Sequence, residues 1–282
     1  MKRGDPAIEH IRSKDGTPIA CLRRGKGLPL VLIHGAAADH TRWTPILPEL
    51  EKHFTVYAVD RRGRGRSGDV EPYTMDREYE DVAAVVDSIP GPVNLLGHSY
   101  GAICSLEASL KTSNLRKLIL YEPPLSNDIK RNYPPDAVER MNSYLNAGEP
   151  EKALLFFLKE VVEIPQREIR MLRILPSWSS RVALAHTLPR EEASVESYVL
   201  NPERFSHMET PTLLLLGGDS PPFFGSSIEL LKRSIPDSRI AVLPGQRHAA
   251  MDTGPKLFLR EVIGFLVPSQ KEESTDEEII SP

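Results

Sequence analysis

Short apolar runs alternate with helical patterns along most of this chain, and this alternation limits the fold more than any other feature. Nearly every position in the runs is hydrophobic, which is typical of strands covered on both faces. The runs are residues 30–33, 56–59, 93–96, 118–121 and 213–216, and a further strand is expected at 239–243. The helical patterns are at about 43–52, 75–88, 100–111 and 256–266. This order predicts an α/β fold with a mostly parallel, doubly wound sheet and right-handed crossovers.

Two strand patterns, 8–12 and 19–22, precede the first buried run. They flank Lys14-Asp15-Gly16, and an Asp-Gly pair between two strands is a strong signal for a tight hairpin turn. We therefore expect the sheet to open with an antiparallel edge.

The strand signal disappears between the runs at 118–121 and 213–216. Prolines interrupt the chain there, and helical patterns follow at 136–146 and 151–162, the second with one apolar stripe. We expect residues 1–124 and 208–268 to form the α/β core and residues 125–207 to form a helical cap inserted into it. Residues 269–282 are polar and acidic, which predicts a flexible tail.

The most informative motif is Gly97-His98-Ser99-Tyr100-Gly101, which lies directly between an expected strand and an expected helix. A Gly-x-Ser-x-Gly sequence in this setting predicts a strained turn that lifts the serine hydroxyl clear of the sheet. The glycines remove side chains that would collide where the turn doubles back. The N-terminus of the following helix would direct N–H groups at the site, where they can stabilise an oxyanion. Ser99 is therefore the candidate nucleophile.

A second motif, His34-Gly35-Ala36, ends the run at 30–33. With both motifs the chain resembles the α/β-hydrolase family over about residues 8–267. The resemblance implies that the backbone N–H groups of Ala36 and Tyr100 form the oxyanion hole. His34 is expected to organise its loop, because the base in this fold comes from near the C-terminus.

A serine hydroxyl becomes a good nucleophile only when a base removes its proton, and histidine suits this role near neutral pH. His248 is the candidate among eight histidines. It lies after the last expected strand and before the last expected helix, which is where the family places its catalytic histidine.

The sequence departs from the family at the third member of the triad. The acid usually follows the strand that matches 213–216, in a Gly-x-x-Asp sequence, but the corresponding positions here hold Ser220 or Pro221. Asp219 comes one or two residues early, and a slip of one residue turns a side chain to the opposite face. Some relatives carry the acid at the end of the preceding strand, where this chain has Glu122. We predict Glu122 as the acid and keep Asp219 as the alternative.

These residues predict a serine hydrolase that cleaves an ester or related acyl substrate through an acyl-enzyme. A carbon–carbon bond hydrolase, a lactonase, a cofactor-free perhydrolase and a non-catalytic small-molecule receptor on the same fold remain alternatives. Ser99 argues against dehalogenases and epoxide hydrolases of this family, which use aspartate as nucleophile. A partly apolar small-molecule substrate is expected, with candidate contacts from Phe156, Phe157, Trp178, Phe223 and Phe224.

Composition adds several exclusions. A net charge of −4 over 282 residues suggests neither nucleic acid nor an anionic membrane as a partner. Cys21 and Cys104 form no disulfide or zinc pattern, and no apolar run approaches a membrane span or a signal peptide, so we expect a soluble cytoplasmic protein. Gly63 to Gly68 spell a dinucleotide-binding pattern without its strand–helix setting, and the arginines among them are expected to be solvated or ion-paired. No cofactor or metal is implied.

Overall fold

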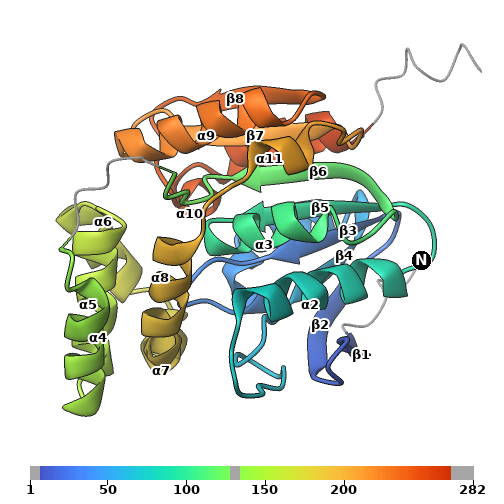
Figure 1. Ribbon diagram of the computed structural model, residues 1–282. Coiled ribbons are helices and arrows are strands. Elements are labelled where there is room, and N and C mark those ends of the chain that lie inside the picture. Colours follow the sequence, from blue (N-terminus) through green and yellow to red (C-terminus); the bar gives the residue numbers. More distant parts are fainter. Residues whose placement is uncertain (1–6, 128–133, 268–282) are drawn as a thin grey trace, which may run out of the picture.

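The computed structural model describes residues 7–127 and 134–267, so the predicted tail at 269–282 lies outside the described residues. One eight-stranded sheet has the strand order β1-β2-β4-β3-β5-β6-β7-β8 (Figure 1). Its strands are β1 (Ala7–Arg12), β2 (Pro18–Gly25), β3 (Leu28–Ile33), β4 (Phe54–Val59), β5 (Val93–His98), β6 (Leu115–Tyr121), β7 (Thr212–Gly217) and β8 (Ser238–Leu243). Strand β2 pairs antiparallel with β1 and β4, and every other pairing is parallel. The predicted parallel sheet with an antiparallel edge is confirmed.

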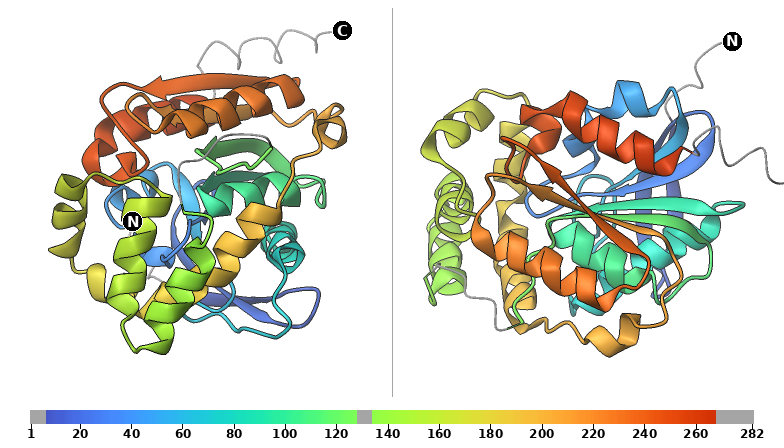
Figure 2. Two further views of the ribbon diagram at one scale, coloured as in Figure 1. Left: turned by 60° about the vertical axis from the view of Figure 1, so that its left-hand side comes forward. Right: turned by 90° about the horizontal axis from the view of Figure 1, so that it is seen from above.

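Helices cover both faces of the sheet, which makes it doubly wound (Figure 2). One hydrophobic cluster packs α2 (Met75–Ser88), α3 (Tyr100–Ala108) and α9 (Pro222–Ser234) against one face. A second cluster packs α1 (Leu47–Leu50) and α11 (Pro255–Leu266) against the other face, beside the short helix α10 (Ala250–Thr253). Strands β3 to β7 are therefore covered on both sides, as their continuous apolar runs predict. Strand β8, at the edge of the sheet, is partly exposed.

The helix predicted at 43–52 is shorter than expected. The structure has a 3₁₀ turn at His40–Trp43 and then α1, which begins at Leu47. Pro48 lacks a backbone N–H, so it fits only in the first turn of a helix, and this places the start of α1 immediately before it. The patterns above also do not predict α9.

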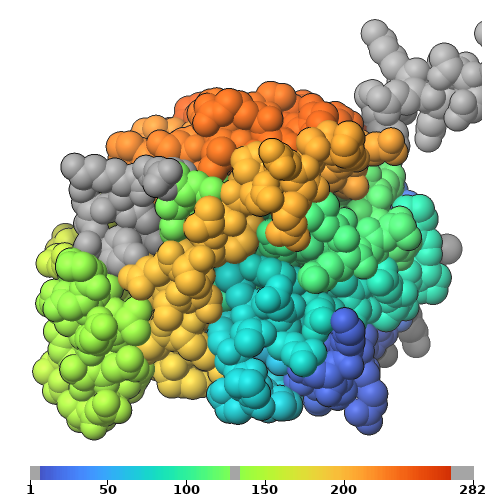
Figure 3. Space-filling view, in the orientation of Figure 1, coloured from blue at the N-terminus to red at the C-terminus, as the bar shows by residue number. Residues whose placement is uncertain are grey.

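The chain between β6 and β7 is helical in its described part. Its helices are α4 (Ala137–Asn146), α5 (Pro150–Phe156), α6 (Gln166–Arg173), α7 (Trp178–Ala183) and α8 (Leu188–Ser197). They flank the sheet domain on one side, at the left of Figures 1 and 3. They also have a hydrophobic cluster of their own, to which the sheet domain adds Ala36 and Ala37 among the described residues. Helices therefore occupy the segment predicted as a cap, and its boundaries at 125 and 207 stay a prediction.

Buried ion pairs join this helical segment to the sheet domain. Arg61 and Arg64 lie in the glycine-rich loop after β4, and both are almost completely buried. Glu191 of α8 lies 2.6 Å from an Arg61 nitrogen and 2.5 Å from an Arg64 nitrogen. Glu78 of α2 accepts two hydrogen bonds of 2.7 Å from Arg61. Burial alone would raise the pKa of Glu78, but the charges of Arg61 and Arg64 hold this pKa at about 2. Arg61 and Arg64 are thus ion-paired and buried, and they anchor the helical segment to the sheet domain.

This network predicts a large loss of stability when Glu191 is replaced. Glu191→Gln leaves the buried guanidinium groups of Arg61 and Arg64 short of one negative charge, which is expected to lower the free energy of unfolding by about 3–5 kcal/mol. Urea unfolding followed by circular dichroism measures the change. The control is Glu160→Gln, which removes an exposed partner of Lys159 and should cost less than about 1 kcal/mol. Equal effects in the two variants would contradict the anchoring role.

None of the helices in residues 7–127 and 134–267 has the length and apolar character needed to cross a membrane. Cys21 and Cys104 are both buried as free thiols.

Candidate active site

Ser99 lies in a strained turn between β5 and α3. Its backbone has φ 55° and ψ −125°, a region that residues with a side chain seldom occupy and that costs about 1–3 kcal/mol. The flanking glycines make the turn possible. A Cβ on Gly97 would lie 2.5 Å from the Gly101 carbonyl oxygen, and a Cβ on Gly101 would lie 2.3 Å from the His34 carbonyl oxygen. The close approach of backbone to backbone therefore requires both glycines of the motif.

The loop after β3 lies directly against Ser99. A Cβ on Gly35 would lie 2.8 Å from the Ser99 Cβ, so the residue at position 35 must be glycine for this contact. Ala36 and Tyr100 line one cavity together with Ser99. Tyr100 is the first residue of α3, where backbone N–H groups have no partner within the helix. The two residues expected to form an oxyanion hole thus line the same cavity as the serine.

His248 and Glu122 form a short hydrogen bond. The His248 Nδ1 atom lies 2.6 Å from one Glu122 carboxylate oxygen, and the Gly217 backbone N–H donates to the other at 2.7 Å. Glu122 is completely buried and His248 is 8% exposed. Both carboxylate oxygens therefore form hydrogen bonds, and these bonds hold the carboxylate against Nδ1 of the imidazole ring. Since Nδ1 faces Glu122, Nε2 is the nitrogen left to face the cavity that His248 shares with Ser99.

Asp219 occupies a different environment. It is exposed, in the turn after β7, and its backbone N–H donates to the Gln246 carbonyl oxygen at 2.9 Å. Glu122 directly follows β6. Its side chain reaches the end of β7, where it accepts from the Gly217 N–H, and it also meets His248, which lies in the loop after β8. The structure brings Glu122 to His248, and it does not bring Asp219 there.

Three further side chains hold His248 in place, and the motifs did not identify them as supports of the histidine. The Phe224 ring stacks on the imidazole with a centroid distance of 4.5 Å and an interplanar angle of 16°. His98 Nε2 lies 2.9 Å from the His248 carbonyl oxygen, and the Tyr121 hydroxyl donates to the adjacent Arg247 carbonyl oxygen. His98 and Tyr121 are β5 and β6 residues, so they could have been found only as neighbours of Ser99 and Glu122 in the sequence.

His34 is held as a neutral ring away from proton transfer. It is completely buried, and burial together with the nearby Arg61 charge lowers its pKa well below the usual value. Its Nδ1 lies 2.8 Å from the Gly35 carbonyl oxygen, and its Nε2 accepts a hydrogen bond of 3.2 Å from the Arg61 backbone N–H. Nδ1 therefore braces the loop after β3, and Nε2 connects that loop to the loop after β4.

Two small cavities meet at Ser99. The first, of about 50 Å³, is lined by Ser99, His248 and Phe157 among others, and the second, of about 20 Å³, adds Phe223 and Phe224. Phe157 begins a single π-helical turn at Phe157–Val161, and such turns are often found at functional sites.

Two of the five predicted aromatic contacts line neither cavity. The Phe156 ring packs inside the helical segment, where the Arg140 guanidinium lies 4.4 Å from its centroid. Trp178 donates from Nε1 to Glu151 at 3.0 Å. Neighbouring helical positions point about 100° apart, so Phe157 reaches the cavity while Phe156 packs within the helical segment.

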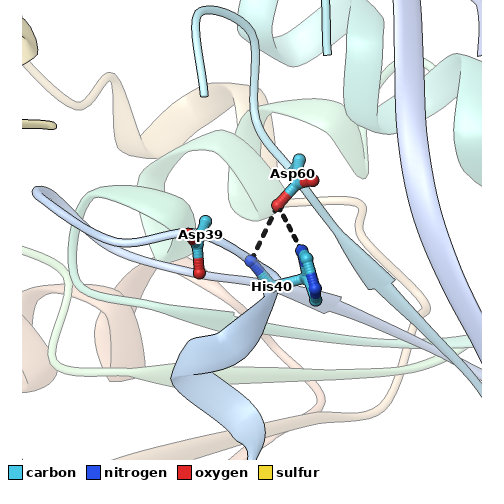
Figure 4. A group of neighbouring side chains, drawn as sticks. All are labelled: Asp39, His40 and Asp60. Atoms are coloured by element: carbon cyan, nitrogen blue, oxygen red, sulfur yellow. Dashed lines mark hydrogen bonds and ion pairs between the residues drawn. The ribbon is translucent and has the colours of Figure 1, made fainter. Parts of the chain in front are cut away.

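One cluster in the described residues has ligand atoms close enough together to hold a metal ion. It consists of Asp39, His40 and Asp60 (Figure 4). Their polar atoms already have protein partners. One Asp60 oxygen accepts from the His40 backbone N–H and from His40 Nδ1, both at 2.8 Å, and the other accepts from the Arg66 N–H at 3.0 Å. Asp39 accepts from Ser180 at 2.8 Å and from Thr41. These hydrogen bonds hold the loop that contains Asp39 and His40 against the loop that contains Asp60 and Arg66.

Comparisons with known proteins agree with this geometry. A model of the alpha/beta hydrolase family matches residues 30–261. The crystal structure of an alpha/beta hydrolase from Sphaerobacter thermophilus is 35% identical, with a TM-score of 0.81, over 92% of this chain and 100% of that one.

Two curated proteins are more distant but similar over most of their length. The 2-(acetamidomethylene)succinate hydrolase of Mesorhizobium japonicum is 25% identical over 86% of this chain and 89% of its own length. The (E)-2-((N-methylformamido)methylene)succinate hydrolase of Acinetobacter baylyi is 24% identical over 83% and 88%, respectively.

Proposed function

Because this chain belongs to the alpha/beta hydrolase family, we propose that it is a serine hydrolase that cleaves an ester or related acyl compound through an acyl-enzyme on Ser99. The observation that carries the proposal is the hydrogen bond between buried Glu122 and His248, because His248 lines the same cavity as Ser99. A nucleophile, a carboxylate and a base in this order along the chain are the parts that acyl transfer requires on this fold.

In the first half-reaction the Ser99 Oγ attacks the carbonyl carbon, and its proton passes to Nε2 of His248. Glu122 stabilises the resulting imidazolium through the hydrogen bond to Nδ1. The negative oxygen of the tetrahedral intermediate accepts hydrogen bonds from the Ala36 and Tyr100 N–H groups. When the intermediate collapses, the bond to the leaving group breaks and Nε2 returns the proton to that group, leaving an ester on Ser99.

In the second half-reaction water attacks the acyl-enzyme. His248 removes a proton from the water, the same oxyanion hole holds the second intermediate, and the proton then returns to the Ser99 oxygen as the acid departs. The cycle consumes one water molecule and restores the free enzyme. We propose that residues 125–207 act as the cap over this site, because Phe157, Leu158 and Val162 line the cavity from the helical segment.

The names of the two relatives suggest that amides, as well as esters, belong among the substrates to consider. Each names a hydrolase of a succinate that carries an acylated amino group. Ester and amide hydrolysis share the same acyl-enzyme chemistry, so an amide is a reasonable substrate to test alongside esters.

A fluorophosphonate probe tests the proposal directly, because it reacts with a serine that a neighbouring base has activated. We expect one adduct per molecule, located on the peptide containing Ser99 by mass spectrometry. Ser226→Ala removes an exposed serine of α9 and should label to the same extent as the wild type. A protein that stays unlabelled, or that labels equally after heat denaturation, would show that Ser99 is not activated.

A further inference from the structure

The charged side chains that line the first cavity at Ser99 are basic. Its lining includes Arg42 and Arg181 together with Ser99 and His248, and it includes no aspartate or glutamate among the described residues. The remaining lining is largely apolar or small, with side chains such as Phe157. The second cavity is different, because Glu191 and Glu192 lie in its wall. The two cavities therefore differ in the charged residues that line them.

Of the two arginines that line this cavity, Arg181 is the one without an ion-pair partner. It lies on α7, and within residues 7–127 and 134–267 its guanidinium forms no hydrogen bond or ion pair. Arg42, by contrast, donates to Asp252 at 2.6 Å.

Asp39 lies in the wall of the adjoining cavity of about 440 Å³, which also contains Arg42, Arg181 and Asp252. Its carboxylate accepts from Ser180 and Thr41, and it forms no ion pair with Arg181. The nearby acidic groups are therefore engaged elsewhere, and Arg181 stays available to a ligand.

The surroundings of Arg181 favour a bound anion. Burial, and then the positive charge of Arg42, lower the pKa of Arg181 to about 10, and the charges of Asp252 and Asp39 offset this lowering only in part. The group stays protonated at neutral pH. A negative group placed beside it would relieve both effects. The planar guanidinium matches a carboxylate, to which it can donate two parallel hydrogen bonds.

We propose that Arg181 binds a carboxylate of the substrate, and that the enzyme acts on acyl compounds that carry a free carboxylate close to the bond that is cleaved. This inference rests on the proposed acyl hydrolysis at Ser99. The small separation between the carboxylate and the cleaved bond follows from the first cavity, whose volume of about 50 Å³ leaves space for only a few water-sized groups between Ser99 and Arg181. Arg42 adds to the positive field while it remains paired with Asp252.

Matched ester pairs test the preference for a carboxylate. Monoethyl succinate and diethyl succinate differ in a charge on the acyl side, and acetoxyacetate and its methyl ester differ on the leaving-group side. We expect a higher kcat/KM for the charged member of at least one pair. In Arg181→Gln the ratio of charged to neutral should fall by roughly 10- to 150-fold, the range for losing hydrogen bonds to a charged group. Arg170→Gln, an exposed arginine of α6, should keep the wild-type ratio.

A binding measurement separates this inference from the proposed reaction. Isothermal titration of Ser99→Ala with succinate and with the neutral succinamide requires no turnover. We expect tighter binding of succinate, and loss of that difference when Arg181→Gln is added. Hydrolysis of both esters with no preference, or a ratio unchanged in Arg181→Gln, would overturn the carboxylate site and leave the reaction standing. If no ester is cleaved, the reaction is wrong, and the titration alone decides the carboxylate site: equal binding of succinate and succinamide overturns it.

Discussion

The Ser99→Ala variant is expected to lose almost all hydrolytic activity and to keep its fold. The hydroxyl is the only group removed, and the alanine keeps the Cβ that already fits against Gly35. Without the nucleophile no acyl-enzyme can form, so only the residual rate from the oxyanion hole and substrate binding remains. A fall in kcat of up to about 10⁶ is expected from comparable triads.

Steady-state kinetics on a good ester substrate measures this loss, and circular dichroism and the unfolding midpoint check the fold. Ser226→Ala is again the matched control, and it should retain the wild-type kcat. Near wild-type hydrolysis by Ser99→Ala would be incompatible with the central assignment.

The second large effect concerns the carboxylate. Glu122→Gln is expected to lower kcat by up to about 10⁴, as when a triad carboxylate becomes an amide. Gly217 can still donate to the amide oxygen, but the amide NH₂ group then faces His248 Nδ1. A donor at that place favours the tautomer with the proton on Nε2, which is the nitrogen that must accept the Ser99 proton. The imidazolium also loses its stabilising negative charge.

Asp219→Asn provides the comparison, because this exposed side chain lies in the turn after β7 rather than at the histidine. Its kcat should stay within a few-fold of the wild type. Both variants are compared on one ester, with folding checked by circular dichroism. If Asp219→Asn were the inactive variant and Glu122→Gln the active one, the acid would belong to the later strand.

Much of the fold could be read from local sequence. The continuous apolar runs predicted strands covered on both faces, and the Asp-Gly turn predicted the antiparallel edge. Helix α2 has the bounds that its periodicity predicted. The bounds of helices were harder to predict where short helices follow one another. Helix α1 is short because of Pro48, and the helix at 151–162 changes to a π-helical turn at Phe157.

In the site, too, some residues could be predicted from local sequence and others could not. Glycines 97 and 101 are required by contacts within a few residues or with the neighbouring strand end, so the motif itself predicts the turn that raises Ser99. The partner of His248 lies 126 residues away in sequence, and two carboxylates were compatible with the pattern. Which of them reaches the imidazole depends on strand order and side-chain length.

The sequence by itself determined the α/β architecture, the strained turn at Ser99 and the position of His248 after the last strand. These depend on periodicity, backbone sterics and chain order, which neighbouring residues encode. Only the tertiary structure decided that Glu122 meets His248, that Glu191 neutralises Arg61 and Arg64, and that Arg181 is left without a counter-ion. Charges are paired or left unpaired by segments that are distant in sequence, and no local pattern records which of them meet.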